Sequence, residues 1–148
     1  MTSRYTFWLW LAAIIQLIAA VTHALSFLQK PEPTNETERQ LLDLATTYRP
    51  EMGPVFHPTA ADLFVGLSAC FTLLYLLGGL TNIYLLRQRI PPEVLKGFTR
   101  IQTFLFGSSF LIMLTFTFLP PIMLSGLVFI ALCFAYATNH IHLVKLKN

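Results

Sequence analysis

The sequence predicts an all-α integral membrane protein: a four-transmembrane-helix, up-down bundle with a short interfacial helix in the first outer loop. Composition is the first reason, since 55% of the 148 residues are hydrophobic and only 11% are charged. An average soluble domain is roughly a quarter charged. The second reason is that the hydrophobic residues gather into four long runs, and the third is that basic residues flank these runs.

The four apolar runs predict helices at about residues 5–28, 60–86, 99–119 and 122–144, within one transmembrane domain over residues 1–148. About 20 residues are needed to cross a hydrocarbon layer ~30 Å thick. Lipid offers the backbone no hydrogen-bond partners, so each run should be helical. The first run could be a secretory signal, but its apolar core is long and the region around Ala24 lacks a convincing cleavage site. We therefore expect this run to be retained.

The basic residues predict that both termini are cytoplasmic, because Lys and Arg favour the cytoplasmic side of a membrane. In that orientation three basic residues lie outside, Lys30, Arg39 and Arg49. Seven lie inside: Arg4, Arg87, Arg89, Lys96, Arg100, Lys145 and Lys147. Because the positive charges lie beside apolar runs, the net charge of +3 does not indicate a nucleic-acid partner.

The first outer loop is long and predicts a helix of its own at about residues 36–48. Asn35, with Glu38 three residues later, is typical of a capping box at a helix start. Leu41, Leu44, Ala45 and Tyr48 then recur at helical spacing. We expect this amphipathic helix to lie on the outer membrane surface. The other connections are predicted to be a basic inner loop over 87–97 and a tight outer hairpin at Pro120 and Pro121.

Small and polar residues in a membrane bundle should face other helices, while large apolar residues face lipid. In the first run, Ala12, Gln16, Ala19 and His23 form one such face, and Ile14 and Ile18 lie opposite. The second run has two such faces. One carries Asp62, Gly66, Ala69 and Leu73, and the other carries Ser68, Thr72, Tyr75, Gly79 and Asn82. The inward residues predicted for the last two runs are Thr99, Thr103, Phe106, Phe110, Thr117, Ser125, Leu132, Tyr136 and Asn139.

His23 and Asp62 are the candidate site, because ionisable residues inside a membrane are costly and tend to be functional. Both lie near the outer ends of their helices, so we expect them to meet as a polar pair, with His57 above and Gln16 below. The pair could bind a ligand or proton, or could clamp two helices together. We identify no catalytic residue.

Metal and haem binding are alternatives that the sequence leaves open. His23, His57, Asp62 and Glu51 could ligate zinc, although their spacing matches no known signature. His23 with His57 is the best pair for a haem, since His140 and His142 have no histidine opposite. Cys70 and Cys133 lie in apolar runs and lack the basic neighbours of a reactive thiol. We therefore expect no cofactor, and the metal question stays open.

Several short features together resemble a known family. They are the Trp-rich start Phe7-Trp8-Leu9-Trp10-Leu11, His23 late in helix one, Met52-Gly53 at the end of the outer loop, and Asp62 followed by Gly66. The chain resembles an uncharacterised family of small four-helix bacterial inner-membrane proteins. That resemblance implies the fold and the bacterial inner (cytoplasmic) membrane, and it implies no activity.

The function that the sequence favours is a non-enzymatic accessory or assembly subunit of a larger inner-membrane complex. The predicted soluble parts are small, so the expected partners are membrane lipid and other membrane-protein subunits. The alternative is a binding protein for a small lipophilic ligand, such as a quinone or lipid, between the helices beneath the first outer loop. The 13 phenylalanines and a polar pair at the bundle mouth would suit such a ligand.

Overall fold

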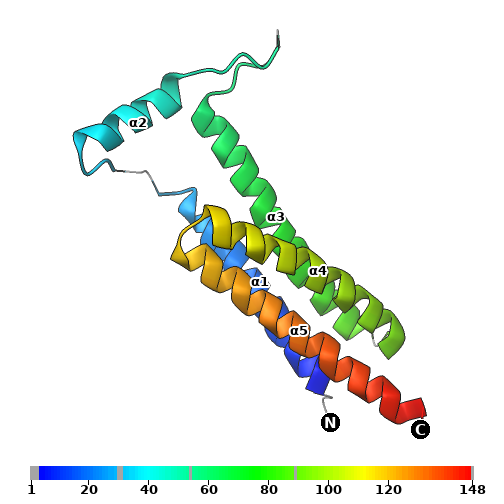
Figure 1. The fold of residues 1–148 in the computed structure, drawn as a ribbon. Helices are drawn as coiled ribbons and strands as arrows, with labels where there is room; N and C mark the ends of the chain where they lie inside the picture. Colours follow the sequence, from blue (N-terminus) through cyan, green and yellow to red (C-terminus); the bar gives the residue numbers. More distant parts are fainter. Residues whose placement is uncertain (1–3, 30–31, 54, 89, 148) are drawn as a thin grey trace. The chain divides into compact units, whose positions relative to one another are not determined.

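The structure is a computed structural model that describes residues 4–29, 32–53, 55–88 and 90–147, with side chains described as far as Asn139. These residues form five helices and no strand (Figure 1). Four of the helices, all except α2, are long and apolar enough to cross a membrane. The predictions of an all-α protein and of four long apolar helices are therefore confirmed. The bounds are α1 Arg4–Ser26, α2 Glu36–Thr47, α3 Ala60–Arg87, α4 Pro92–Phe116 and α5 Leu119–Lys147.

The connection before α4 is shorter than the sequence suggested, and the connection before α5 is equally short but lies three residues earlier, because prolines begin helices here and do not fill loops. α4 begins at Pro92, well before the predicted residue 99. Likewise α5 begins at Leu119, which puts Pro120 and Pro121 in its first turn. Proline suits the first turn of a helix, where its missing N–H would have no partner. The apolar run over 99–119 therefore marked only the hydrophobic part of α4.

The chain divides into two compact units. We call Met1–Ala19 with Tyr75–Asn148 the first unit, and Ala20–Leu74 the second unit. The division cuts through α1 and α3, so it separates regions of packing and does not test the predicted single domain.

Aromatic contacts join the helices of the first unit. Trp8 of α1 stacks on Phe134 of α5, with ring centroids 4.6 Å apart. Phe110 of α4 lies against Phe129 of α5 at 6.0 Å, and α4 and α5 run side by side (Figure 1). Ala12, Gln16 and Ala19 are buried while Ile14 and Ile18 are exposed, as predicted for the two sides of α1.

Two glycines let α1 and α3 approach closely in the first unit. A Cβ on Gly79 would lie 2.9 Å from the Leu17 side chain and 3.1 Å from the Ala13 carbonyl oxygen. A Cβ on Gly78 would lie 2.7 Å from Nε2 of Gln16 and 2.9 Å from the Phe106 ring. Small residues at such crossings are typical of helices that pack in membranes.

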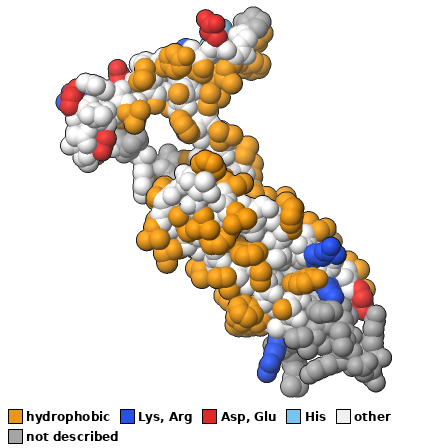
Figure 2. All heavy atoms as spheres, viewed as in Figure 1, with side chains coloured by type: hydrophobic (Ala, Val, Ile, Leu, Met, Phe, Trp, Pro, Cys, Tyr) orange, Lys and Arg blue, Asp and Glu red, His pale blue; other side chains and the backbone are white. Residues whose placement is uncertain are grey.

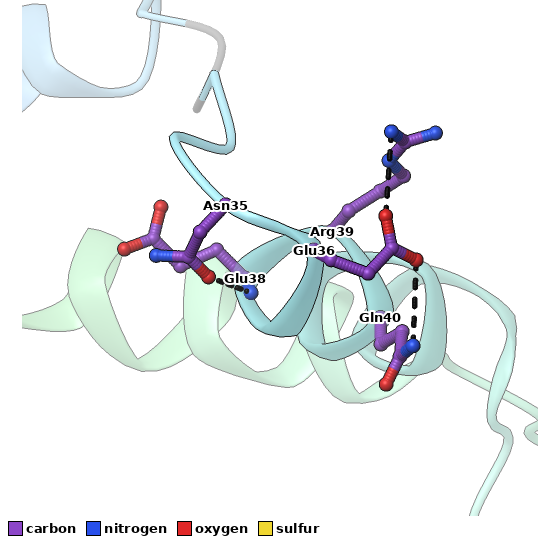
Figure 3. A network of polar contacts seen from close by, with 5 residues as sticks. All are labelled: Asn35, Glu36, Glu38, Arg39 and Gln40. Carbon is purple, nitrogen blue, oxygen red and sulfur yellow. Dashed lines mark hydrogen bonds and ion pairs between the residues drawn. The ribbon is translucent and has the colours of Figure 1, made fainter.

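The second unit is organised by local hydrogen bonds. At the start of α2, Oδ1 of Asn35 accepts from the Glu38 backbone N–H at 2.8 Å, as the capping box predicted (Figure 3). The Glu38 carboxylate accepts from the backbone N–H and hydroxyl of Thr34, each at 2.7 Å. Beyond α2, the Ala60 N–H donates to the Tyr48 carbonyl, and the Arg49 guanidinium donates to the His57 carbonyl at 2.7 Å. These two bonds close the loop that connects α2 to α3.

Some predicted inward faces are wrong. On α3, Asp62, Gly66 and Leu73 are exposed, whereas Tyr75, Gly79 and Asn82 of the other predicted face are buried. On α4, Thr99 and Phe106 are buried but Thr117 is exposed at the C-cap. Asp62 and Thr117 lie where their helices begin and end, and a helix end has fewer neighbouring helices to face, whereas Leu73 lies in the middle of α3 on the face opposite to the buried one.

Candidate functional site

Three amide side chains meet inside the first unit, one from each of three helices. They are Gln16 of α1, Asn82 of α3 and Gln102 of α4, and we call them the amide cluster. All three residues are buried. A buried amide without partners is costly, so this cluster must satisfy itself from within the protein.

Each pair of residues in the amide cluster is joined by at least one hydrogen bond. Nδ2 of Asn82 donates to Oε1 of Gln16 and to Oε1 of Gln102, each at 2.9 Å. In return, Nε2 of Gln102 donates to Oδ1 of Asn82 at 3.1 Å. Nε2 of Gln16 completes the triangle, 3.3 Å from Oε1 of Gln102. Each amide oxygen accepts at least one hydrogen bond, so the cluster leaves no buried acceptor of its own unpaired.

The surroundings of the amide cluster are aromatic and small. Tyr75 of α3 meets Phe106 of α4 edge to face, with centroids 5.1 Å apart, and both residues are buried. The Cβ that Gly78 lacks would fall between Phe106 and Nε2 of Gln16, so the glycine makes the room that the cluster occupies. Glycine, the smallest residue, therefore stands at position 78, where α3 passes the Gln16 amide of α1.

The chemistry open to the amide cluster is hydrogen bonding alone. A carboxamide has no proton to give or take near neutral pH, and it offers two donors and one acceptor group. The cluster therefore joins helices and does not transfer protons. Gln16, which the sequence placed beneath His23 in a polar site, is committed to Asn82 and Gln102 instead.

His23 lies in an aromatic environment in the second unit. Its ring packs edge to face against Phe27 at 5.5 Å and against Phe71 at 5.3 Å. Its Nε2 atom is buried and has no hydrogen-bond partner among the described residues. The predicted inward direction of His23 is therefore consistent with the structure, but a polar nitrogen is left among phenylalanines.

Asp62 serves the start of α3 and does not pair with His23. Its carboxylate accepts from the Thr59 backbone N–H at 2.9 Å and from the Thr59 hydroxyl at 2.8 Å. The Thr59 hydroxyl also accepts from the Asp62 backbone N–H at 3.2 Å, which makes a reciprocal capping box. No hydrogen bond or ion pair joins Asp62 to His23 within the described part of the chain. The signal that the sequence offered for this cap was Thr59 three residues before an acidic residue.

His57 is exposed in the loop before α3, where its backbone carbonyl accepts from Arg49. No group of three or more His, Cys, Asp or Glu side chains that could hold a metal ion is found among the described residues, so His23, His57, Asp62 and Glu51 do not form the zinc site considered above. The side chains of His140 and His142 lie outside the described ones.

A second interhelical contact lies at the start of α4. Nδ2 of Asn139 on α5 donates to the Pro92 carbonyl at 3.1 Å, and its Oδ1 is buried without a partner among the described residues. Nearby on the same two helices, Nζ of Lys96 lies 5.6 Å from the centre of the Tyr136 ring. Asn139 was predicted to face inward, and it does so by holding α5 to the first turn of α4.

Gln102 is the functional candidate that the sequence reasoning missed, because Gln102 was placed on no predicted inward face and the candidate site was built around ionisable side chains. A usable signal was present. Gln16, Asn82 and Gln102 are amides placed inside apolar runs, and a buried amide needs partners almost as strictly as a buried charge does. Three such residues on three helices predict mutual contact.

Comparison with models of protein families, with curated proteins and with solved structures finds no match to this chain. The resemblance to a family of small bacterial inner-membrane proteins therefore stays a prediction.

Proposed function

We propose that this protein is a non-enzymatic accessory or assembly subunit of a larger complex in a bacterial inner membrane. In this proposal the four long helices cross the membrane in up-down order, and both termini face the cytoplasm. The observation that supports the proposal most is that α2 and the loop after it, which lie outside the candidate membrane spans, leave large apolar side chains exposed. These exposed residues are Leu41, Leu44, Tyr48, Met52, Val55 and Phe56.

The core of the first unit supports a structural role. Its buried amides bond to one another and so hold α1, α3 and α4 together. Exposed apolar residues on a span are expected to meet lipid. The apolar residues of α2 and of the loop 48–58 need another explanation, because they lie outside the candidate membrane spans. Large exposed apolar patches commonly mark interaction sites.

The test is extraction of the tagged chain from its native membrane directly into polymer-bounded lipid particles, followed by mass measurement of the intact particles' protein. We expect a defined complex in which this chain and another membrane protein occur in a fixed ratio. A particle that holds this chain as its only protein, at native expression level, would refute the subunit role.

His23 favours a second candidate function, the binding of a small lipophilic ligand such as a quinone or lipid. A buried imidazole nitrogen without a partner, edge-on to Phe27 and Phe71, could hydrogen-bond a polar group carried on an apolar molecule. The measurement is organic extraction of the purified protein with quantification of quinones and lipids by mass spectrometry. A ligand at one copy per chain that is lost in His23→Phe would favour this function, and equal retention in both proteins would exclude it.

A further inference from the structure

Helix α2 carries an apolar ridge that no part of the described chain covers. Leu41, Leu44 and Tyr48 are 67%, 58% and 57% exposed, and α2 has no buried residue among its 12. Their spacing of three and then four residues places them in one row along the helix. Amphipathic helices that bind in a groove of a partner protein contact it through apolar residues at this spacing.

Hydrogen bonds at both ends of α2 stabilise the helix that carries the apolar ridge of Leu41, Leu44 and Tyr48. Asn35 caps the first turn, Glu38 is bonded to Thr34, and Glu36 pairs with Arg39 at 3.3 Å while accepting from Gln40 (Figure 3). At the other end, the Tyr48 N–H donates to the Leu44 carbonyl at 2.8 Å. A helix this short is marginal alone, so such caps reduce the ordering that binding must impose.

The polar face of α2 is acidic. It carries the carboxylates of Glu36, Glu38 and Asp43 against a single basic residue, Arg39. These carboxylates appear as red patches on α2 in Figure 2. Helices that rest on lipid headgroups are typically rich in Lys and Arg, because many membranes are anionic. The charge of α2 is the opposite of that pattern, which disfavours a lipid surface as the cover of the ridge.

A second copy of this chain is also a poor cover. Among its described residues, the second unit carries two basic residues, Arg39 and Arg49, against six acidic ones: Glu32, Glu36, Glu38, Asp43, Glu51 and Asp62. A copy inserted in the same direction would bring its own acidic segment to α2.

From the ridge, the caps and the charge, we propose that α2 docks its Leu41–Leu44–Tyr48 ridge into an apolar groove with a basic rim on a partner membrane protein. The inference rests on the proposed accessory function and deepens it by naming the docking element and the chemistry of its receptor. Apolar contact supplies the adhesion, and the acidic face selects the partner through charge complementarity.

The experiment compares single cysteines at two α2 positions, in a chain whose Cys70 and Cys133 are replaced by alanine. Leu41→Cys reports on the ridge, and Thr46→Cys, on the polar side of the same helix, is the matched control. Each is labelled with an impermeant maleimide in native membranes and, after purification, in vesicles of phosphatidylethanolamine and phosphatidylglycerol that hold no other protein. We expect Leu41→Cys to react at least about tenfold more slowly in native membranes than in the vesicles, which corresponds to about 1.4 kcal/mol of protection. Thr46→Cys should react at the same rate in both.

Charge is tested by adding Asp43→Lys to the Leu41→Cys chain. The reversed charge should remove most of the protection in native membranes and leave labelling in vesicles unchanged. Protection of Leu41→Cys in pure lipid vesicles would show that lipid covers the ridge and would overturn the proposal. Equal reactivity in both membranes, or protection indifferent to Asp43→Lys, would overturn it as well.

These outcomes are distinguishable from failure of the accessory function itself. The same native membranes are extracted into lipid particles, and their protein content is measured. A fixed-ratio complex combined with a freely reactive Leu41→Cys would leave the accessory function standing and reject α2 as its docking element. A particle holding this chain alone would reject both.

Discussion

The two units use polar side chains in opposite ways. In the first unit, the amides of Gln16, Asn82 and Gln102 bond across three helices. In the second unit, Asn35, Glu38, Thr59 and Asp62 bond to residues three or four positions away in the sequence. Polar groups therefore hold tertiary structure in one unit and only local structure in the other. Changes to polar residues should consequently spread through the first unit and stay local in the second.

The largest expected effect is the loss of Asn82, which makes three of the four bonds in the amide cluster. An interhelical hydrogen bond in a membrane is worth about 0.6 kcal/mol on average, and an unpaired buried amide costs about 1–3 kcal/mol. We expect Asn82→Ala to lower the free energy of unfolding by about 2–4 kcal/mol, measured by titration with a denaturing detergent in mixed micelles.

The matched control for Asn82 is its neighbour Thr81, whose hydroxyl donates only to the Leu77 carbonyl in its own helix. Thr81→Ala should change stability by no more than about 0.5 kcal/mol. Equal effects of the two substitutions would mean that the amide cluster does not hold the helices together.

The next effect compares two glycines of α3, one in each unit. A Cβ at Gly78 would press on Gln16 and Phe106, whereas a Cβ at Gly66 would meet nothing within 4 Å. We expect Gly78→Ala to destabilise by about 1–3 kcal/mol through overpacking. Gly66→Ala should stabilise by up to about 1 kcal/mol, because alanine favours a helix. Thermal unfolding of both variants in one lipid mixture measures the two changes in stability. If both substitutions raised stability, or both lowered it, the proposed difference between the two sites would be wrong.

A smaller and local effect is expected at the start of α3. Thr59→Ala removes the cap bonds to Asp62 and should cost about 1 kcal/mol. Amide hydrogen exchange should rise in the first turn of α3 and stay unchanged around Asn82, while Thr59→Ser should restore protection.

His23 and Asp62 should contribute to stability independently, because they share no bond. The losses of unfolding free energy caused by His23→Ala and Asp62→Ala should therefore add, within about 0.5 kcal/mol, in the double variant. A larger coupling would reinstate the pair predicted from the sequence.

The smallest effect is a pH dependence of the first turn of α2. Hydrogen bonds from the backbone N–H and then the hydroxyl of Thr34 hold the pKa of Glu38 below its ordinary value of 4.5. Since the folded pKa is the lower one, the stabilisation is complete above the unfolded pKa and is lost as pH falls through the folded pKa. Carboxyl NMR titration should show the pKa of Glu38 below its ordinary value. Thr34→Ala keeps the backbone N–H and removes the hydroxyl, so it should move the pKa of Glu38 part of the way back toward 4.5, and an unchanged value would show that the hydroxyl does not contribute.

The sequence predicted the helices well and the polar contacts poorly, for a physical reason. Long apolar runs and the face of Ala12, Gln16 and Ala19 follow from one helix at a time, so periodicity was enough to identify them. Which polar groups meet depends on how several helices are rotated about their axes, and spacing within one helix does not set that rotation. Asp62 shows a further limit, since equal depth suggested His23 as its partner while a threonine three residues away was available at less entropic cost.

The amide cluster also sets an order of events during biogenesis. The ribosome delivers α1 first and α3 before α4, so Gln16 and Asn82 leave the ribosome while Gln102 is still unmade. At that stage one bond of the cluster can form, between Asn82 and Gln16, because the other three all involve Gln102. The nascent pair of helices thus carries unsatisfied amides until α4 arrives. Its arrival completes the triangle, so the third long helix closes a structure that the first two can only begin.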